Sequence, residues 1–77
     1  MERMKRLSQT QLKVMKWLGN GWSALPGSGS AVMVNGRRVC NLDTMQALER
    51  HGLVTKDEDR RWDATDHGKE FAKALGL

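Results

Sequence analysis

The chain has 77 residues, which is enough for one small domain with a single hydrophobic core and too few for a second core. Hydrophobic residues make up 39% and charged residues 29%, a composition that excludes a disordered chain, and no apolar run approaches the ~20 residues needed to cross a bilayer. The net charge is +4, and the single cysteine excludes an internal disulfide. No apolar stretch of signal-peptide type follows the charged N-terminal residues, so we expect a cytoplasmic protein.

The positive charge is concentrated in the first half of the chain. Residues 1–38 carry seven basic side chains and one acidic one, whereas residues 39–77 carry six basic and eight acidic ones. The two halves therefore have net charges of +6 and −2. This asymmetry is compatible with a polyanionic partner on one face, and equally with the ordinary charge of a small basic protein.

The first predicted elements are a flexible basic arm over residues 1–6 and a helix that starts after Ser8. The Ser8 hydroxyl can accept a hydrogen bond from the backbone near Gln11, and the Gln11 side chain can reach back, which makes a capping box. Glycine and asparagine at residues 19–21 should end this helix, because both tolerate the left-handed turn. Its apolar stripe comprises Leu12, Val14, Met15, Trp17 and Leu18.

Residues 22–40 are predicted to be rich in β structure. Residues 22–25 predict a short strand, and residues 26–30 predict a Gly/Ser loop. Asn35-Gly36 lies between two β-prone runs, which is the strongest short-range signal of a two-residue hairpin turn. The cross-strand neighbours expected in this hairpin are Val32 with Val39 and Val34 with Arg37.

A second helix is expected from about Leu42 to His51, with Asn41 or Asp43 as its N-cap and Gly52 in its C-terminal turn. Its buried stripe should comprise Leu42, Met45 and Leu48, and continue at Leu53.

A second hairpin follows, with strands over residues 53–56 and 61–64 and a charged tip at residues 57–60. Thr65 should cap a final helix. The element order α-β-β(-β)-α-β-β-α predicts an α+β fold for a single small domain over residues 7–77. The inner side of the final helix should comprise Phe71, Ala72 and Leu75.

Residues 42–75 resemble the second half of a winged-helix domain of the kind found in MarR-like bacterial regulators. The segments that carry the resemblance are Thr44–Val54, Asp59–Trp62 and Ala64–Lys69 with Glu70. In that family they correspond to the recognition helix, the wing with its Asp-Arg pair, and the turn into the last helix. The resemblance implies a winged-helix-like domain, DNA binding and transcription regulation, in a small protein of phage or mobile-element type.

The chain departs from the family pattern at one place. A helix-turn-helix has a supporting helix just before the recognition helix. Here a Gly/Ser loop and the Asn35-Gly36 hairpin occupy that stretch, so we expect a motif that is incomplete or rebuilt with strands.

Eight side chains are candidate DNA contacts. Arg37 and Arg38 can clamp phosphates beside the second helix, or one can face solvent while the other packs on the sheet. In the second helix, arginine can read guanine and glutamine can read adenine, but Asp43 and Glu49 give residues 42–51 a net charge of −1, which favours a plain solvated face. The full candidate set is Arg37, Arg38, Thr44, Gln46, Arg50, Lys56, Arg60 and Arg61.

The second hairpin and the tryptophans allow two interpretations each. The basic residues at 56, 60 and 61 can reach a phosphate or a minor groove, or the acidic residues at 57–59 can neutralise them locally. Trp17 and Trp62 lie on apolar faces and are expected in the core, whereas an exposed Trp22 would indicate a partner surface.

No pattern in the chain predicts catalysis, a metal site or a cofactor. Cys40 fits a small apolar position in a strand, and His51 and His67 have no partners at metal-ligand spacing. The leading hypothesis is a small non-catalytic protein that binds double-stranded DNA. The alternative is a protein-interaction module, for example a phage-encoded modulator of a host complex. We expect no membrane association, and the sequence leaves a homodimer open.

Overall fold

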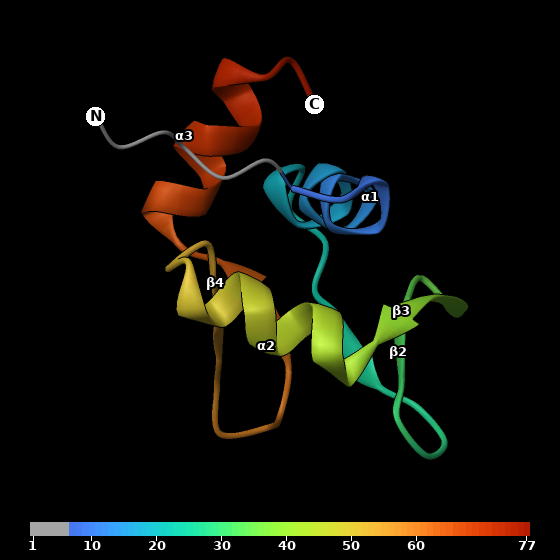
Figure 1. The fold of residues 1–77 in the computed structure, drawn as a ribbon. Coiled ribbons are helices and arrows are strands. Elements are labelled where there is room, and N and C mark those ends of the chain that lie inside the picture. Colours follow the sequence, from blue (N-terminus) through green and yellow to red (C-terminus); the bar gives the residue numbers. More distant parts are fainter. Residues whose placement is uncertain (1–6) are drawn as a thin grey trace.

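Three helices and five short strands make up residues 7–77, the part of the chain that this computed structural model describes (Figure 1). The order α-β-β-β-α-β-β-α confirms the α+β class and the succession of elements expected from the sequence. The basic arm expected at residues 1–6 lies outside the described residues. The elements are α1 (Gln9–Gly19), β1 (Leu25–Pro26), β2 (Ala31–Val34), β3 (Arg37–Asn41), α2 (Leu42–Arg50), β4 (Val54–Lys56), β5 (Trp62–Ala64) and α3 (Asp66–Ala74).

The starts of α1 and α3 are capped as predicted. The Ser8 hydroxyl accepts from the Gln11 backbone N–H at 3.1 Å, and the Gln11 side-chain oxygen accepts from the Ser8 backbone N–H at 2.7 Å. Thr65 Oγ1 accepts from the Gly68 N–H at 2.9 Å and donates to the Gly52 carbonyl at 2.7 Å. The bonds from backbone N–H groups satisfy donors that have no partner within a helix. The bond from Thr65 to the Gly52 carbonyl ties the start of α3 to the end of α2.

The start of α2 at Leu42 and the N-cap position of Asn41 are confirmed, but the capping hydrogen bond is not. Instead, Asn41 Oδ1 accepts from Arg38 Nη2 at 2.6 Å, because β3 runs directly into α2 and brings the guanidinium within reach.

All three helices end in the same way. The N–H of the residue after each terminal glycine bonds to the carbonyl five residues earlier, and that glycine has a positive φ, which defines a Schellman motif. In α3, the Leu77 N–H bonds to the Ala72 carbonyl at 2.9 Å, and Gly76 has φ of 75°. The corresponding glycines after α1 and α2 are Gly21 and Gly52.

The Schellman motif of α3 explains why Leu75 is not on the inner side, as the sequence predicted. Leu75 is the C-cap residue and is 52% exposed. The turn at Gly76 carries the chain back, and Leu77 packs against the core in place of Leu75. Phe71 and Ala72 face inward as expected.

Strands β1, β2 and β3 form an antiparallel sheet in that order. The turn at Asn35-Gly36 has positive φ at both residues, as predicted, and Val34 pairs with Arg37. The expected pair of Val32 with Val39 is wrong, because a register shift pairs Val32 with Cys40. The shift is a β-bulge, which lets the consecutive residues 39 and 40 both be buried where strict alternation would expose one of them.

The first strand is also displaced from its predicted position. It comprises Leu25–Pro26 and not residues 22–25, so Pro26 belongs to a strand and not to the loop. Proline is tolerated there because β1 is an edge strand of the sheet, where no neighbour requires its missing N–H.

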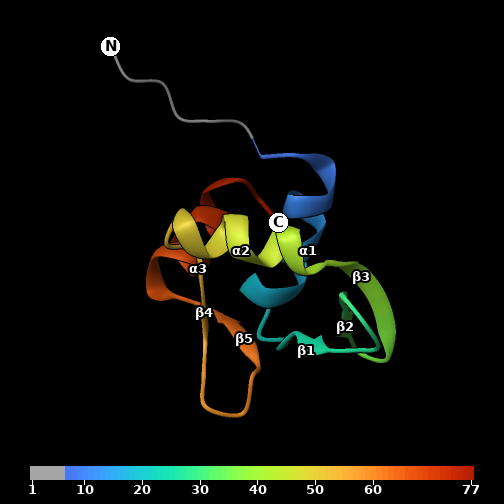
Figure 2. The ribbon, with the colours of Figure 1, turned by 60° about the horizontal axis from the view of Figure 1, so that its bottom comes forward.

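A single bridge joins the two sheets. Ala24 and Trp62 exchange two backbone hydrogen bonds of 2.9 Å, which link the segment after α1 to the hairpin β4–β5. Both residues belong to the core, together with buried side chains from every helix. Figure 2 shows the two hairpins extending from this junction, with α2 lying apart from both tips. Trp62 is confirmed as a core residue at 2% exposure, and Trp17 is half-buried and packs against the core.

Gly68 marks the closest approach between α3 and the rest of the fold. A Cβ atom at this position would lie deep inside the van der Waals radius of the Leu53 carbonyl oxygen, a backbone atom. Glycine at this position therefore allows the helix to lie directly on the start of the second hairpin.

We predict that Gly68→Ala destabilises the protein by about 1–3 kcal/mol, because overpacking against backbone outweighs the higher helix propensity of alanine. Urea unfolding measures the change. Lys73→Ala is the matched control, since Lys73 is exposed on the same helix and its loss should change the free energy of unfolding by less than about 0.5 kcal/mol. A stabilised Gly68→Ala variant would contradict the packing described above.

Candidate nucleic-acid interface

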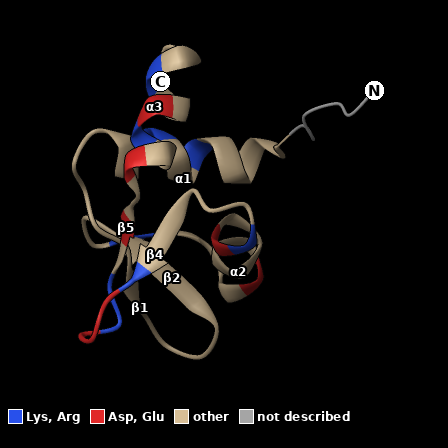
Figure 3. Cartoon of the chain, turned by 90° about the vertical axis from the view of Figure 1, so that its left-hand side faces the viewer, with Lys and Arg blue, Asp and Glu red and all other residues tan. Residues whose placement is uncertain are grey.

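The eight candidate residues lie in three separate places. Arg37 and Arg38 follow the β2–β3 turn, three more residues lie on α2, and the last three belong to the hairpin β4–β5. Figure 3 shows α2 on one side of the body and the tip of β4–β5 on the other. The structure therefore does not bring the eight side chains onto one face.

The tip of β4–β5 is organised by Asp57. Its Oδ1 atom accepts from the backbone N–H of Asp59 at 2.9 Å and of Arg61 at 3.0 Å. The Arg61 side chain lies 3.8 Å from Asp57 Oδ2 and 3.5 Å from Asp59 Oδ2. The carboxylates thus fix the turn and neutralise one of its two arginines, while the other, Arg60, is exposed with a positive φ of 67°.

Lys56 is held against the core tryptophan. Its Nζ atom lies 5.3 Å from the centroid of the Trp62 ring, a cation–π arrangement. Trp62 Nε1 is buried and has no hydrogen-bond partner, so the indole contributes to this site through its ring and not through its N–H.

On α2, Arg50 is the one basic side chain, and it shares the exposed surface of the helix with two acidic ones. Gln46 and Arg50 are exposed and Thr44 is partly exposed, while Asp43 and Glu49 are exposed as well. A phosphate that approached Arg50 would also approach Glu49, which weakens the attraction.

The most uniform electrostatic feature is the segment of residues 7–41, which comprises α1 and the sheet β1–β2–β3 and contains no aspartate or glutamate. We call it the acid-free segment. Its exposed cations come from α1 and from β3, which pack against each other. Within the described part of the chain, Arg61 alone makes ion pairs within 4 Å. The cations of the acid-free segment are Lys13, Lys16, Arg37 and Arg38.

The charge asymmetry is visible in the sequence, but the sequence does not show which of these cations the fold brings together. The signal that could have found the segment is the absence of carboxylates from 35 consecutive residues, 7–41, which the sequence itself displays.

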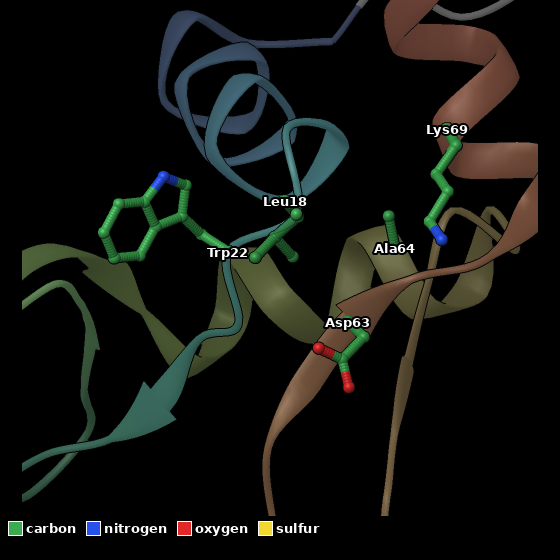
Figure 4. Close-up of a pocket in the computed structure, with 6 residues that line it drawn as sticks. Leu18, Trp22, Asp63, Ala64 and Lys69 are labelled. Carbon is green, nitrogen blue, oxygen red and sulfur yellow. The ribbon is translucent and has the colours of Figure 1, made fainter.

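An open pocket of about 150 Å³ lies between the end of α1, β5 and α3. Figure 4 shows Trp22 at one side of it, with its indole directed away from Asp63 and Lys69. The Asp63 carboxylate accepts a hydrogen bond from the Ser23 hydroxyl. The charged groups of the pocket do not converge on one point, and this geometry offers no acid–base pair.

Cys40 is buried beside Val39, and burial raises the pKa of its thiol to about 11 although the nearby Arg38 opposes the shift. The thiol is therefore protonated at neutral pH and is a poor nucleophile. Within residues 7–77, no three His, Cys, Asp or Glu side chains gather as a metal site would require, and no helix has the length and apolarity to cross a bilayer.

Comparisons with protein-family models, with curated proteins and with solved structures found no significant match to this chain. The winged-helix interpretation stays a prediction from the sequence.

We predict that Asp57→Ala loosens the hairpin tip, because two backbone N–H groups lose their acceptor. Limited trypsin digestion at Arg60 and Arg61 should accelerate about tenfold, which corresponds to about 1.4 kcal/mol of local opening. Glu58→Ala is the matched control, since Glu58 lies in the same turn and no hydrogen bond to its side chain occurs within the described residues. Equal acceleration in both variants would show that Asp57 does not organise the turn.

Proposed function

We propose that this chain is a small non-catalytic protein that binds double-stranded DNA, with a winged-helix-like arrangement in which the hairpin β2–β3 replaces the supporting helix. The observation that carries the proposal is the acid-free segment, where four exposed cations lie in 35 residues without a carboxylate. A phosphate backbone gains most affinity where cations are not compensated by neighbouring acids.

The layout of the second half of the chain supports the winged-helix-like part of the proposal. Helix α2 is followed by the hairpin β4–β5 and then by α3, which is the order that the resemblance implies. The bridge between Ala24 and Trp62 adds a third segment to the hairpin.

The electrostatics favour contacts through α1 and the β2–β3 turn over contacts through α2 and the tip of β4–β5. Arg37 has no ion pair within the described residues, whereas Arg61 is paired with two carboxylates. Arg50 follows Glu49 directly on α2. We therefore infer that the acid-free segment contributes most of the phosphate contacts.

The second candidate function is a protein-interaction module, for example a phage-encoded modulator of a host complex. Two observations favour it: Leu25 on β1 is 45% exposed, and the acidic residues of α2 and of the hairpin tip would suit a basic protein surface better than DNA.

An electrophoretic shift assay with duplex DNA over a range of salt concentrations tests the leading proposal. Each lost phosphate contact should reduce the slope of log affinity against log salt by ~0.9. We predict this reduction for Arg37→Ala and an unchanged slope for Arg50→Ala, the matched control on α2.

Absence of binding even at low salt would refute the proposal. If a protein partner were then retained from a lysate after nuclease treatment, the interaction-module function would replace it. If Arg50→Ala reduced the slope more than Arg37→Ala did, the phosphate contacts would lie on α2 and not on the acid-free segment.

A further inference from the structure

Trp22 is fixed in position although it lies at the surface. It follows Gly21, whose φ is 101°, and its N–H donates to the Trp17 carbonyl at 3.2 Å in the Schellman motif of α1. The two indole rings contact each other with centroids 5.4 Å apart and planes at 86°. This contact is the apolar one that accompanies such motifs, and it holds Trp22 in one orientation.

The arrangement leaves a large part of the Trp22 ring free. The side chain is 43% exposed, and perpendicular rings touch through an edge, so Trp17 covers at most one face of Trp22. Figure 4 shows the indole projecting between α1 and β1, away from the charged groups of the pocket. An aromatic face that is exposed and already held in one orientation can bind a partner with little further loss of side-chain freedom.

The surroundings of Trp22 favour an anionic partner. Lys13 precedes Trp17 by four residues and therefore lies on the same side of α1. Across the sheet, Leu25 pairs with Met33 and Met33 pairs with Arg38, on the face opposite the buried valines of β2. No carboxylate belongs to these elements. Asp63 and Lys69 both line the pocket beside Trp22 and carry opposite formal charges, so this pair adds no net charge.

We propose that Trp22 stacks an unpaired nucleobase, so that the protein binds single-stranded stretches of DNA in addition to the duplex of the proposed function. This inference rests on the proposed function, because the cations of the acid-free segment would hold the phosphates of the strand whose base is stacked. Aromatic side chains next to a basic surface are the usual means of binding single strands without sequence preference. In an intact duplex the bases already stack on each other, and their faces are not accessible to Trp22.

Three ligands separate the contribution of the bases from that of the phosphates: a short oligothymidylate, a duplex of the same length, and a deoxyribose-phosphate oligomer of equal charge without bases. Tryptophan fluorescence and fluorescence anisotropy are measured for each. We expect the duplex and the oligothymidylate both to bind, and the oligothymidylate to quench the fluorescence more strongly than the duplex, because only its bases can contact the indole.

Trp22→Ala should weaken binding of the oligothymidylate between about fivefold and about a hundredfold and abolish most of the quenching, while affinity for the oligomer without bases stays unchanged. Trp22→Phe keeps an aromatic face and should retain part of the affinity, and it serves as the variant of choice if the alanine variant folds poorly. Leu75→Ala is the matched control, since Leu75 is an exposed apolar residue on α3.

Each other outcome overturns the inference. Equal affinity for the three ligands, with no effect of Trp22→Ala, would show that phosphate contacts act alone and would leave the proposed function intact. If an acidic polyglutamate peptide bound as tightly as the oligothymidylate and with the same dependence on Trp22, the surface would be a peptide site. Failure of all nucleic acids to bind would remove the proposed function together with the inference.

Discussion

The two hydrogen bonds between Ala24 and Trp62 are the contact on which the rest of the structure depends. They join the segment after α1 to β5, so that the three-stranded sheet and the hairpin β4–β5 share one core. Ala24 is fully buried, and Trp62 fills the space beneath Lys56. This junction adds to the packing of α1 against α3 and α2, so that the acid-free segment and the second half of the chain share a core that neither could bury alone.

Features that depend on local chemistry could be predicted from the sequence, and those that depend on distant partners could not. Ser8 and Thr65 cap their helices as expected, and the Asn35-Gly36 turn forms as expected, because each depends on a few neighbouring residues. The bulge at Val39 depends on which side chains the helices leave room for. The exposure of Leu75 also depends on distant partners, because Leu77 packs against the core after the turn at Gly76 and takes the position expected for Leu75.

The candidate site shows the same division. The concentration of basic residues in the first half of the chain could be counted directly from the sequence. The eight candidate contacts were chosen by resemblance and by residue type, and the fold distributes them over three places because two hairpins and a helix point in different directions (Figure 3). The ion pair between Arg61 and Asp57 depends on the backbone conformation of the turn, which residue types alone do not specify. The exposure of Trp22 likewise follows from where α1 ends against the sheet.

The central claim is that the acid-free segment, held to the rest of the fold at Ala24 and Trp62, is the surface that meets DNA. Chemical-shift mapping of the ¹⁵N-labelled protein during titration with DNA tests it most directly. We expect the largest shifts on amides of α1 and of β1–β3, including Lys13 and Arg37, and little change at the hairpin tip over residues 57–60 or on the outer face of α2. Shifts confined to α2 and the tip of β4–β5 would contradict the account.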